Sequence, residues 1–272
     1  MKKINSHELH ALLLDLAITF DRICKNNKIP YYMLGGTMLG AVRHQGFIPW
    51  DDDMDFGVSS EFFPRLLEAL SLELPEYYKV RTIKNCDLFY VNFIKIEDTR
   101  TLINEVGKSE CNDKIGIFLD IFPLYRTNSK KSIFSLNSII VKLVTLQAII
   151  FTDTSQRKGM KKKIASIAKT IYPFSRFTIH KLIDYLFKLR EHHGKRNDCI
   201  CNFYGAWGLK ELISAKIIGN PKEYKFENIT LSGVENSDAY LKSLYNNYME
   251  LPPVEKRRIH LKEMFFVSKD HI

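Results

Sequence analysis

Four aspartates stand close together in residues 50–56 (WDDDMDF). Residues two apart in an extended strand share a face, so we expect Asp53 and Asp55 to project together, with Asp51 beside them. Carboxylates that close repel each other unless a cation lies between them, and oxygen ligands suit Mg²⁺ or Mn²⁺. An acidic surface turn is the alternative. The two apolar residues of the run disfavour it, because they bury one face of the strand.

A further carboxylate, Asp120, interrupts the apolar run 117–122 (IFLDIF), which is typical of a central strand buried on both faces. An isolated buried carboxylate is costly. We therefore expect Asp120 to face a metal ion, another cation or hydrogen-bond donors. A purely structural basic partner is the alternative.

A glycine turn precedes these acids. Gly35 and Gly36 follow a short apolar strand, and Thr37 is predicted to cap a helix that runs to about His44. The free N–H groups and positive end of such a helix suit a phosphate group. Arg43 and His44, at the far end of the same helix, are either phosphate ligands or ordinary surface residues.

Other catalytic signatures are missing from the sequence. It has no Walker A motif, no Gly-x-Gly-x-x-Gly after a strand, no His-Glu-x-x-His and no Gly-x-Ser-x-Gly. The set His192, His193, Cys199 and Cys201 is a weak zinc candidate, because a second cysteine pair is lacking. The five cysteines form an odd, scattered set, which favours a reducing compartment and a cytoplasmic location.

Residues 34–44 (LGGTMLGAVRH) and 46–55 (GFIPWDDDMD) closely resemble the signature of LicD-family proteins. Residues 226–253 resemble the same family more loosely. These proteins are bacterial phosphocholine transferases, related to the fukutin-type ribitol-phosphate transferases, within the nucleotidyltransferase superfamily. The resemblance implies an α+β fold: a nucleotidyltransferase-like mixed sheet with helices around it, plus a helical insert and a helical C-terminal part.

The resemblance also implies a site. The catalytic residues and metal ligands that it implies are Asp53, Asp55 and Asp120. The substrate-binding residues that it implies are Gly35, Gly36, Thr37, Arg43, His44 and Asp51. The metal would be Mg²⁺ or Mn²⁺, and Asp120 would also orient or deprotonate the acceptor hydroxyl. We expect asparagine at any of the three ligand positions to reduce turnover by several orders of magnitude and leave the fold intact.

The implied reaction moves a phospho-alcohol, with phosphocholine favoured, from a CDP-linked donor. The acceptor would be a hydroxyl of a cell-surface glycan or of its lipid-linked precursor, and CMP would leave. Two rivals stay open: an NTP-dependent nucleotidyltransferase acting on a small molecule, and a non-catalytic surface adaptor. We expect no nucleic-acid partner.

The charge of the 272-residue chain is unevenly distributed. Its net charge is +9, yet eleven Lys and Arg residues and a single acid lie between residues 126 and 176. Such a segment favours an anionic partner, and residues 133–151 within it are too polar to span a membrane readily. We therefore expect peripheral association with an anionic membrane on its cytoplasmic face. A basic face that only keeps the protein soluble is the alternative. The expected divisions are a catalytic core (1–125), a basic helical insert (126–195) and a C-terminal part completing the active-site cleft (196–272).

Overall fold

The structure, a computed structural model, describes residues 1–82, 93–105, 115–129, 135–151, 198–257 and 261–267, with the isolated positions 166, 167, 170, 182, 185–187 and 259. Within these residues it combines a mixed sheet with helices, which confirms the predicted α+β class. The strands are β1 (Lys2–Lys3), β2 (Tyr31–Met33), β3 (Asp55–Ser59), β4 (Tyr78–Arg81), β5 (Ile94–Glu105), β6 (Ile115–Thr127), β7 (Cys199–Cys201), β8 (Leu212–Ser214), β9 (Lys222–Phe226), β10 (Ile229–Gly233) and β11 (Leu261–Phe266). The α-helices are α1 (Ser6–Asn26), α2 (Gly35–His44), α3 (Phe63–Glu73), α4 (Leu136–Phe151), α6 (Ala215–Ile218) and α7 (Ser237–Tyr245). Short 3₁₀ helices are η1 (Ser60–Phe62), η2 (Gly208–Glu211) and η3 (Val254–Lys256).

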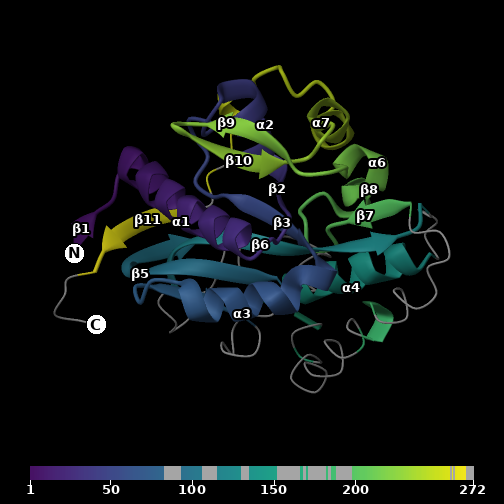
Figure 1. Ribbon diagram of the computed structural model, residues 1–272, viewed down its shortest axis with the longest axis horizontal. Helices are drawn as coiled ribbons and strands as arrows, with labels where there is room; N and C mark the ends of the chain where they lie inside the picture. The colour runs from purple at the N-terminus through teal and green to yellow at the C-terminus, as the bar shows by residue number, and fades with distance from the viewer. Residues whose placement is uncertain are drawn as a thin grey trace.

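The main path of the sheet runs β1-β11-β5-β6-β3-β2-β10-β9, with β4 paired to β5 and β7 joining β6 to β8 (Figure 1). Among the described pairs, β3 runs parallel to β6 and β10 runs parallel to β2, whereas the others are antiparallel. The parallel pairing of β3 with β6 brings two distant parts of the sequence together. It sets the position of the predicted carboxylates.

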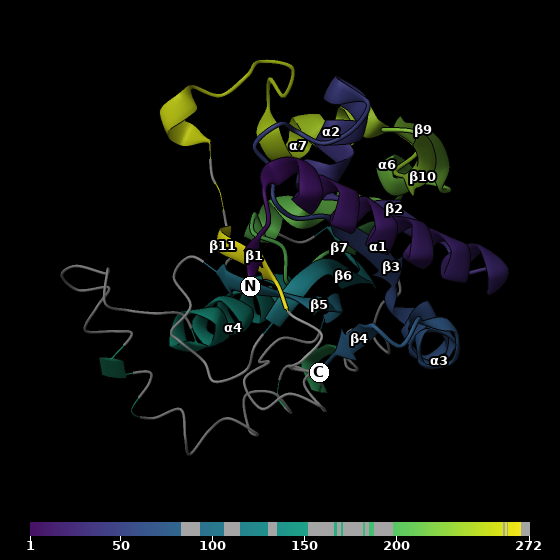
Figure 2. The same cartoon turned by 90° about the vertical axis from the view of Figure 1, so that its left-hand side faces the viewer.

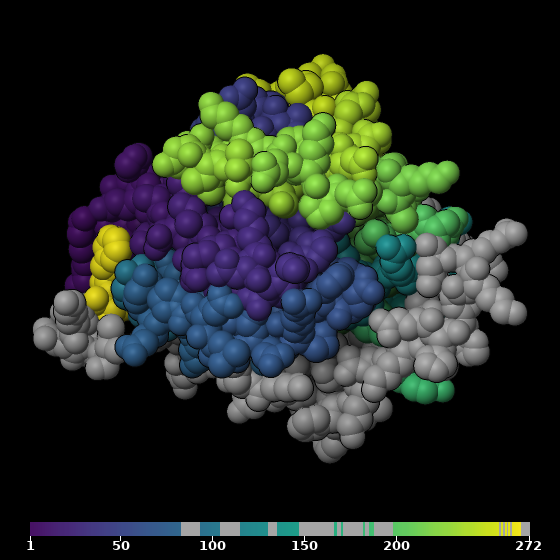
Figure 3. Space-filling model, viewed as in Figure 1, coloured from purple at the N-terminus to yellow at the C-terminus, as the bar shows by residue number. Residues whose placement is uncertain are grey.

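Helix α1 packs its apolar side onto this sheet. A capping box begins it, in which the Asn5 side chain accepts from the Glu8 N–H and the Glu8 side chain accepts from the Asn5 N–H. Leu13, Leu16 and Phe20 are fully buried, and such burial stabilises a fold by roughly 1.5–3 kcal/mol for each large apolar side chain. In the space-filling view, α1 (purple) lies between the C-terminal hairpin (green) and the blue residues that follow β3 (Figure 3).

The C-terminal part was predicted to be helical, and this prediction is incomplete, because the part also contains strands. It contributes α7, but β9, β10 and β11 also join the same sheet as the N-terminal strands. Helices α2 and α7 contact each other and lie side by side in both cartoon views (Figures 1 and 2). The C-terminal part therefore completes the sheet and flanks the glycine turn.

Helix α4 lies in the basic segment and packs on a second, smaller apolar cluster. Its Ile140 and Val144 are buried against Cys201 and Phe203. Its Asn137 is buried as well and donates to the Asn128 carbonyl over 2.9 Å. Within the described residues, no helix has the length and apolar character needed to cross a membrane. Most of the remaining basic segment lies outside the described residues.

Candidate active site

Asp55 and Asp120 lie side by side on neighbouring strands. They are register partners in the parallel pair of β3 and β6. The Asp120 N–H also donates to the Met54 carbonyl over 3.0 Å. Strand β3 begins at Asp55, so Asp53 belongs to the preceding loop and not to the strand that the sequence predicted. Asp53 therefore reaches the cluster from the loop.

The electrostatics of Asp55 show that the four predicted acids lie close together. Burial raises the pKa of Asp55 well above its usual value, and repulsion by Asp53, Asp120 and Asp51 raises it further. Lys95 opposes this shift. Because charges act on a pKa mainly over short distances, Asp53, Asp120 and Asp51 lie within electrostatic reach of Asp55.

Lys95 is the residue that the sequence analysis missed. Its Nζ lies 2.6 Å from Asp120 Oδ1 and 3.2 Å from the centroid of the Phe118 ring. The Lys95 and Asp120 side chains are 5% and 14% exposed. The structure supplies a cation for Asp120, and this buried lysine also fits the alternative of a purely structural basic partner. The available signal was a lysine between Ile94 and Ile96 in an apolar strand.

The carboxylate cluster suits a hard divalent cation in chemistry and in charge. Its donors are all oxygens, and the buried Asp55 would gain from a nearby positive charge. Among the residues that the structure describes, however, no three His, Cys, Asp or Glu side chains already form a metal site. Coordination by Asp53, Asp55 and Asp120 would therefore require their side chains to turn toward a common point.

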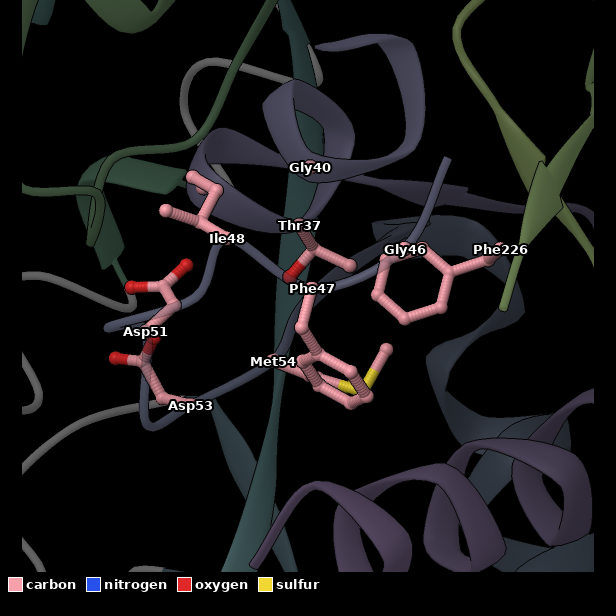
Figure 4. A pocket seen from close by; sticks show the side chains of 10 residues that line it. Thr37, Gly40, Gly46, Phe47, Ile48, Asp51, Asp53, Met54 and Phe226 are labelled. Carbon is pink, nitrogen blue, oxygen red and sulfur yellow. The ribbon is translucent and has the colours of Figure 1, made fainter. Parts of the chain in front are cut away.

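A small pocket lies between α2 and the loop 45–54, which carries three of the aspartates. Its lining includes Gly36, Thr37, Phe47, Asp51, Asp53 and Phe226. In Figure 4 the carboxylates of Asp51 and Asp53 point to the same side, away from Phe47 and Phe226. The pocket therefore has an acidic side and an apolar side.

Residues distant in sequence hold this loop from the apolar side. His10 Nε2 lies 2.8 Å from the Asp51 carbonyl oxygen, and the His10 ring stacks on Phe47 at 4.1 Å. Glu227 Oε1 accepts from the Phe47 N–H over 2.9 Å, and the Glu227 N–H donates to the Gln45 carbonyl over 2.7 Å. These contacts come from α1 and from the β9–β10 turn.

The C-terminal end of the described chain fixes the loop on another side. The Leu261 N–H donates to Asp52 Oδ2 over 2.6 Å, and Asp52 is buried. The Arg257 guanidinium lies 4.1 Å from the centre of a Trp50 ring. Asp52 therefore has a structural role, which sets it apart from its neighbours in the acidic run.

The glycine turn differs from its predicted form. Helix α2 begins at Gly35 with Leu34 as its N-cap, so the prediction of Thr37 as the cap is wrong. Thr37 lies inside the first turns, and its Oγ1 accepts from the Asp55 N–H over 2.8 Å. The Thr37 hydroxyl thereby ties α2 to the start of β3.

Each glycine of the turn occupies a position that disfavours a side chain, one because of its backbone conformation and the other because of a close neighbour. Gly35 has a φ of +49°, a conformation that favours glycine, and its N–H donates to the Tyr240 hydroxyl over 3.1 Å. A Cβ on Gly36 would lie 2.7 Å from Asp51 Oδ2. Gly36 thus admits a carboxylate close to the helix backbone. The phosphate-binding role of the turn stays a prediction.

Arg43 and His44 lie at the other end of α2. Arg43 Nη1 donates to the Tyr248 carbonyl over 2.7 Å, and Arg43 Nε donates to His44 Nε2 over 3.0 Å. Burial lowers the pKa of Arg43, whereas Tyr245 and Asp51 raise it. Burial, and then the Arg43 charge, lower the pKa of His44. Arg43 therefore lies within electrostatic reach of Asp51, while part of its guanidinium fixes the segment after α7.

Of the four zinc candidates, the structure describes the two cysteines but not the two histidines. Cys199 and Cys201 are buried in β7 and pack in the second apolar cluster. His192 and His193 lie outside the described residues.

Comparisons with known proteins extend these observations. Residues 28–138 match the protein family described as LicD/FKTN/FKRP, nucleotidyltransferase domain. Over 279 residues the chain is 28% identical to the lipopolysaccharide cholinephosphotransferase LicD of Haemophilus influenzae, a match that covers 96% of this chain and 97% of that protein. Uncharacterised proteins of Rickettsia prowazekii and Rickettsia typhi are each 56% identical over 43 residues, which cover 16% of this chain and 16% and 14% of theirs. The family match contains the glycine turn, the acidic run and Asp120.

Proposed function

We propose, from the premise that this chain carries a LicD-family nucleotidyltransferase domain, that it transfers phosphocholine from a CDP-linked donor to a hydroxyl of a cell-surface glycan or its lipid-linked precursor. The family match and the relative in Haemophilus influenzae confirm the resemblance inferred from the sequence. They support a phosphotransferase. The observation that carries the proposal is the juxtaposition of Asp55 and Asp120 beside the N-terminus of α2.

The proposed step breaks the pyrophosphate bond of the donor. The acceptor hydroxyl attacks the phosphorus that bears choline, CMP leaves, and the hydroxyl proton passes to Asp120. The ion pair with Lys95 fixes the position of the Asp120 carboxylate, which a proton acceptor requires. Arg43 lies where it can offset negative charge that develops near Asp51.

The proposal includes a divalent cation, Mg²⁺ or Mn²⁺. Asp53, Asp55 and Asp120 would hold it, with Asp51 as an accessory ligand, and it would neutralise the charge of the donor pyrophosphate. The raised pKa of the buried Asp55 supports the need for such a charge. The N–H groups at the start of α2, at Gly35 and Gly36, would hold phosphate oxygens.

The test is to incubate the purified protein with Mg²⁺, an acceptor glycan and labelled CDP-choline or CTP. Release of CMP from CDP-choline supports the proposal, whereas release of pyrophosphate from CTP supports the NTP-dependent alternative. Asp55→Asn should abolish CMP release, and a chelator should do the same. Glu68→Gln removes an exposed acid on α3 and serves as the matched control. An Asp55→Asn protein with full activity would refute the proposed site and favour a non-catalytic adaptor.

We also propose that the basic segment binds an anionic membrane on the cytoplasmic side, where a lipid-linked acceptor would lie. Each Lys or Arg near such a surface contributes about 1 kcal/mol, and salt screens the attraction. Co-sedimentation with liposomes should therefore require anionic lipid and weaken at high salt. Replacement of Lys158, Lys161, Lys162 and Lys163 by Gln should weaken it further. Binding that resists both changes would contradict this proposal.

A further inference from the structure

An aromatic pair stands next to the carboxylates on the C-terminal side of the site. Trp207 is 41% exposed, although large aromatic side chains contribute most when buried. Its ring meets the Tyr245 ring edge-on, with 5.2 Å between centroids and an interplanar angle of 83°. The Trp207 side chain also lowers the pKa of Tyr245, against the larger effect of burial, which raises it. Trp207 precedes η2, and Tyr245 ends α7.

This pair adjoins the start of α2. A Cβ atom added to Gly35 would lie 3.4 Å from Asp55 Oδ2 and 3.7 Å from the Tyr245 hydroxyl oxygen. The Gly35 N–H itself donates to the hydroxyl of Tyr240, which is also in α7. Helix α2 contacts α7, and the two lie side by side (Figures 1 and 2). Helix α7 in turn contacts η2, which Trp207 precedes. The aromatic pair therefore borders the place proposed for the donor phosphates.

A buried acid accompanies the pair. Glu211 is 7% exposed, and burial raises its pKa to about 7, while a backbone hydrogen bond from Trp207 acts in the opposite direction. Its charge contributes to the raised pKa of both Tyr240 and Tyr245. Among the residues described, none forms an ion pair with Glu211. A buried carboxylate without a cation is costly, so a cationic ligand at this place would be favoured.

The same aromatic surface already attracts one cation of the chain. Lys210 Nζ lies 5.5 Å from the centroid of the Trp207 ring, within the range of a cation–π interaction. Lys210 is exposed and flexible, so a ligand can displace its ammonium. A bound ligand cation would meet the same ring, and the Trp207 backbone is within reach of the Glu211 carboxylate.

From this arrangement we infer that Trp207, Tyr245 and Glu211 form the subsite for the cationic head of the transferred alcohol, a quaternary ammonium group. Aromatic faces recognise quaternary ammonium ions, which cannot donate hydrogen bonds and therefore favour rings and diffuse negative charge. In phosphocholine a short ethylene chain separates the ammonium from the phosphate, so the two binding places must be neighbours. The inference rests on the proposed function for the identity of the substrate, but the cation site itself does not.

Intrinsic fluorescence tests the subsite without any donor. The chain has two tryptophans, so a Trp50→Phe protein reports on Trp207 alone. Choline chloride should change this emission in a saturable way, whereas potassium chloride at equal ionic strength and the neutral glycerol should not. In the same background, Glu211→Gln and Tyr245→Leu should each weaken choline binding by roughly tenfold.

Matched variants serve as controls for the choline-binding measurement. Glu223→Gln removes an exposed acid on β9 and should leave choline binding unchanged. Lys210→Met removes the internal cation and should leave choline binding equal or tighter. Absence of a choline-specific change in Trp207 emission, or equal choline affinity in the Glu211→Gln protein, would overturn the inference. Circular dichroism of each variant establishes that it is folded.

Turnover separates this inference from the proposed function. In a CMP-release assay, Trp207→Leu should raise the KM for CDP-choline by roughly tenfold and leave inhibition by CDP, which lacks the ammonium, unchanged. An unchanged KM in Trp207→Leu and Glu211→Gln would overturn the subsite while the proposed function stands. Saturable choline binding without CMP release from CDP-choline would support the cation subsite and refute the proposed function.

Discussion

Removal of the Lys95 charge tests how the carboxylate cluster is held together. Lys95→Met keeps a side chain of similar length but leaves Asp120 without the ammonium that now lies 2.6 Å away. Loss of one partner from a buried ion pair costs about 3–5 kcal/mol. We expect the lower end, about 3 kcal/mol, because the Asp120 side chain is 14% exposed and solvent can offset part of the loss.

The structure also corrects one consequence of the sequence analysis. Asp120→Asn was expected to leave the fold intact, but it would leave the Lys95 ammonium buried without this carboxylate. We therefore expect it to destabilise the protein by a similar amount. The double variant Lys95→Met/Asp120→Asn buries neither charge, so it should be more stable than the sum of the single losses predicts.

Thermal unfolding without divalent metal, followed by calorimetry and circular dichroism, measures this cycle. A loss of about 3 kcal/mol lowers the melting temperature of a domain of this size by roughly 6–12 °C. The Lys95→Met protein should regain stability with Mg²⁺ if Asp55 and Asp120 bind the ion, because a ligand stabilises the state to which it binds. A Lys95→Met protein that melts together with the wild type, or strictly additive single losses, would refute the reasoning.

Three further predictions follow from single contacts. Gly36→Ala should displace the Asp51 carboxylate, which would lie 2.7 Å from the new Cβ, and titration calorimetry with CDP-choline should show weakened binding; unchanged affinity would contradict this. Glu211 has a folded-state pKa of about 7 against an ordinary 4.5, so the free energy of unfolding should fall by roughly 3 kcal/mol as pH rises between these values. Urea titrations at several pH values should show that Glu211→Gln lacks this fall, and an unaltered pH profile would count against it. Glu227→Ala leaves the Phe47 N–H without its carboxylate acceptor, so it should lower the free energy of unfolding in urea by about 1–2 kcal/mol and also lower CMP release. Glu227→Gln should restore both, and failure of that rescue would argue against the contact.

Local patterns were enough to predict the carboxylates and the glycine turn. The run around Asp53 and Asp55 and the apolar strand around Asp120 each lie within a few residues, so their spacing carries the information. The start of α2 was misplaced because Leu34 has no side-chain cap, and Thr37 was the nearest residue with a capping side chain. The Thr37 hydroxyl instead serves the Asp55 N–H, a tertiary contact that no local pattern encodes.

The supporting residues escaped prediction because sheet pairing brings them to the site. Lys95 becomes a neighbour of Asp120 only through the antiparallel register of β5 with β6. Glu227 reaches the acidic loop because β9 and β10 join the sheet beside β2. A sequence pattern of periods 2 and 3.6 indicates elements and faces, but it does not give the order of strands.

The arrangement of the site also explains why the chain beyond residue 125 matters to a motif that lies before it. Residues 1–125 hold the carboxylates, but the Leu261 N–H binds Asp52, Glu227 holds the loop, and the Tyr240 hydroxyl accepts from Gly35. The C-terminal strands thus fix the backbone on which the acids are carried. The aromatic pair that borders the acids also comes from this part. The same C-terminal segment therefore positions the predicted acids and also carries the aromatic pair to which we assign the ammonium group of the proposed substrate.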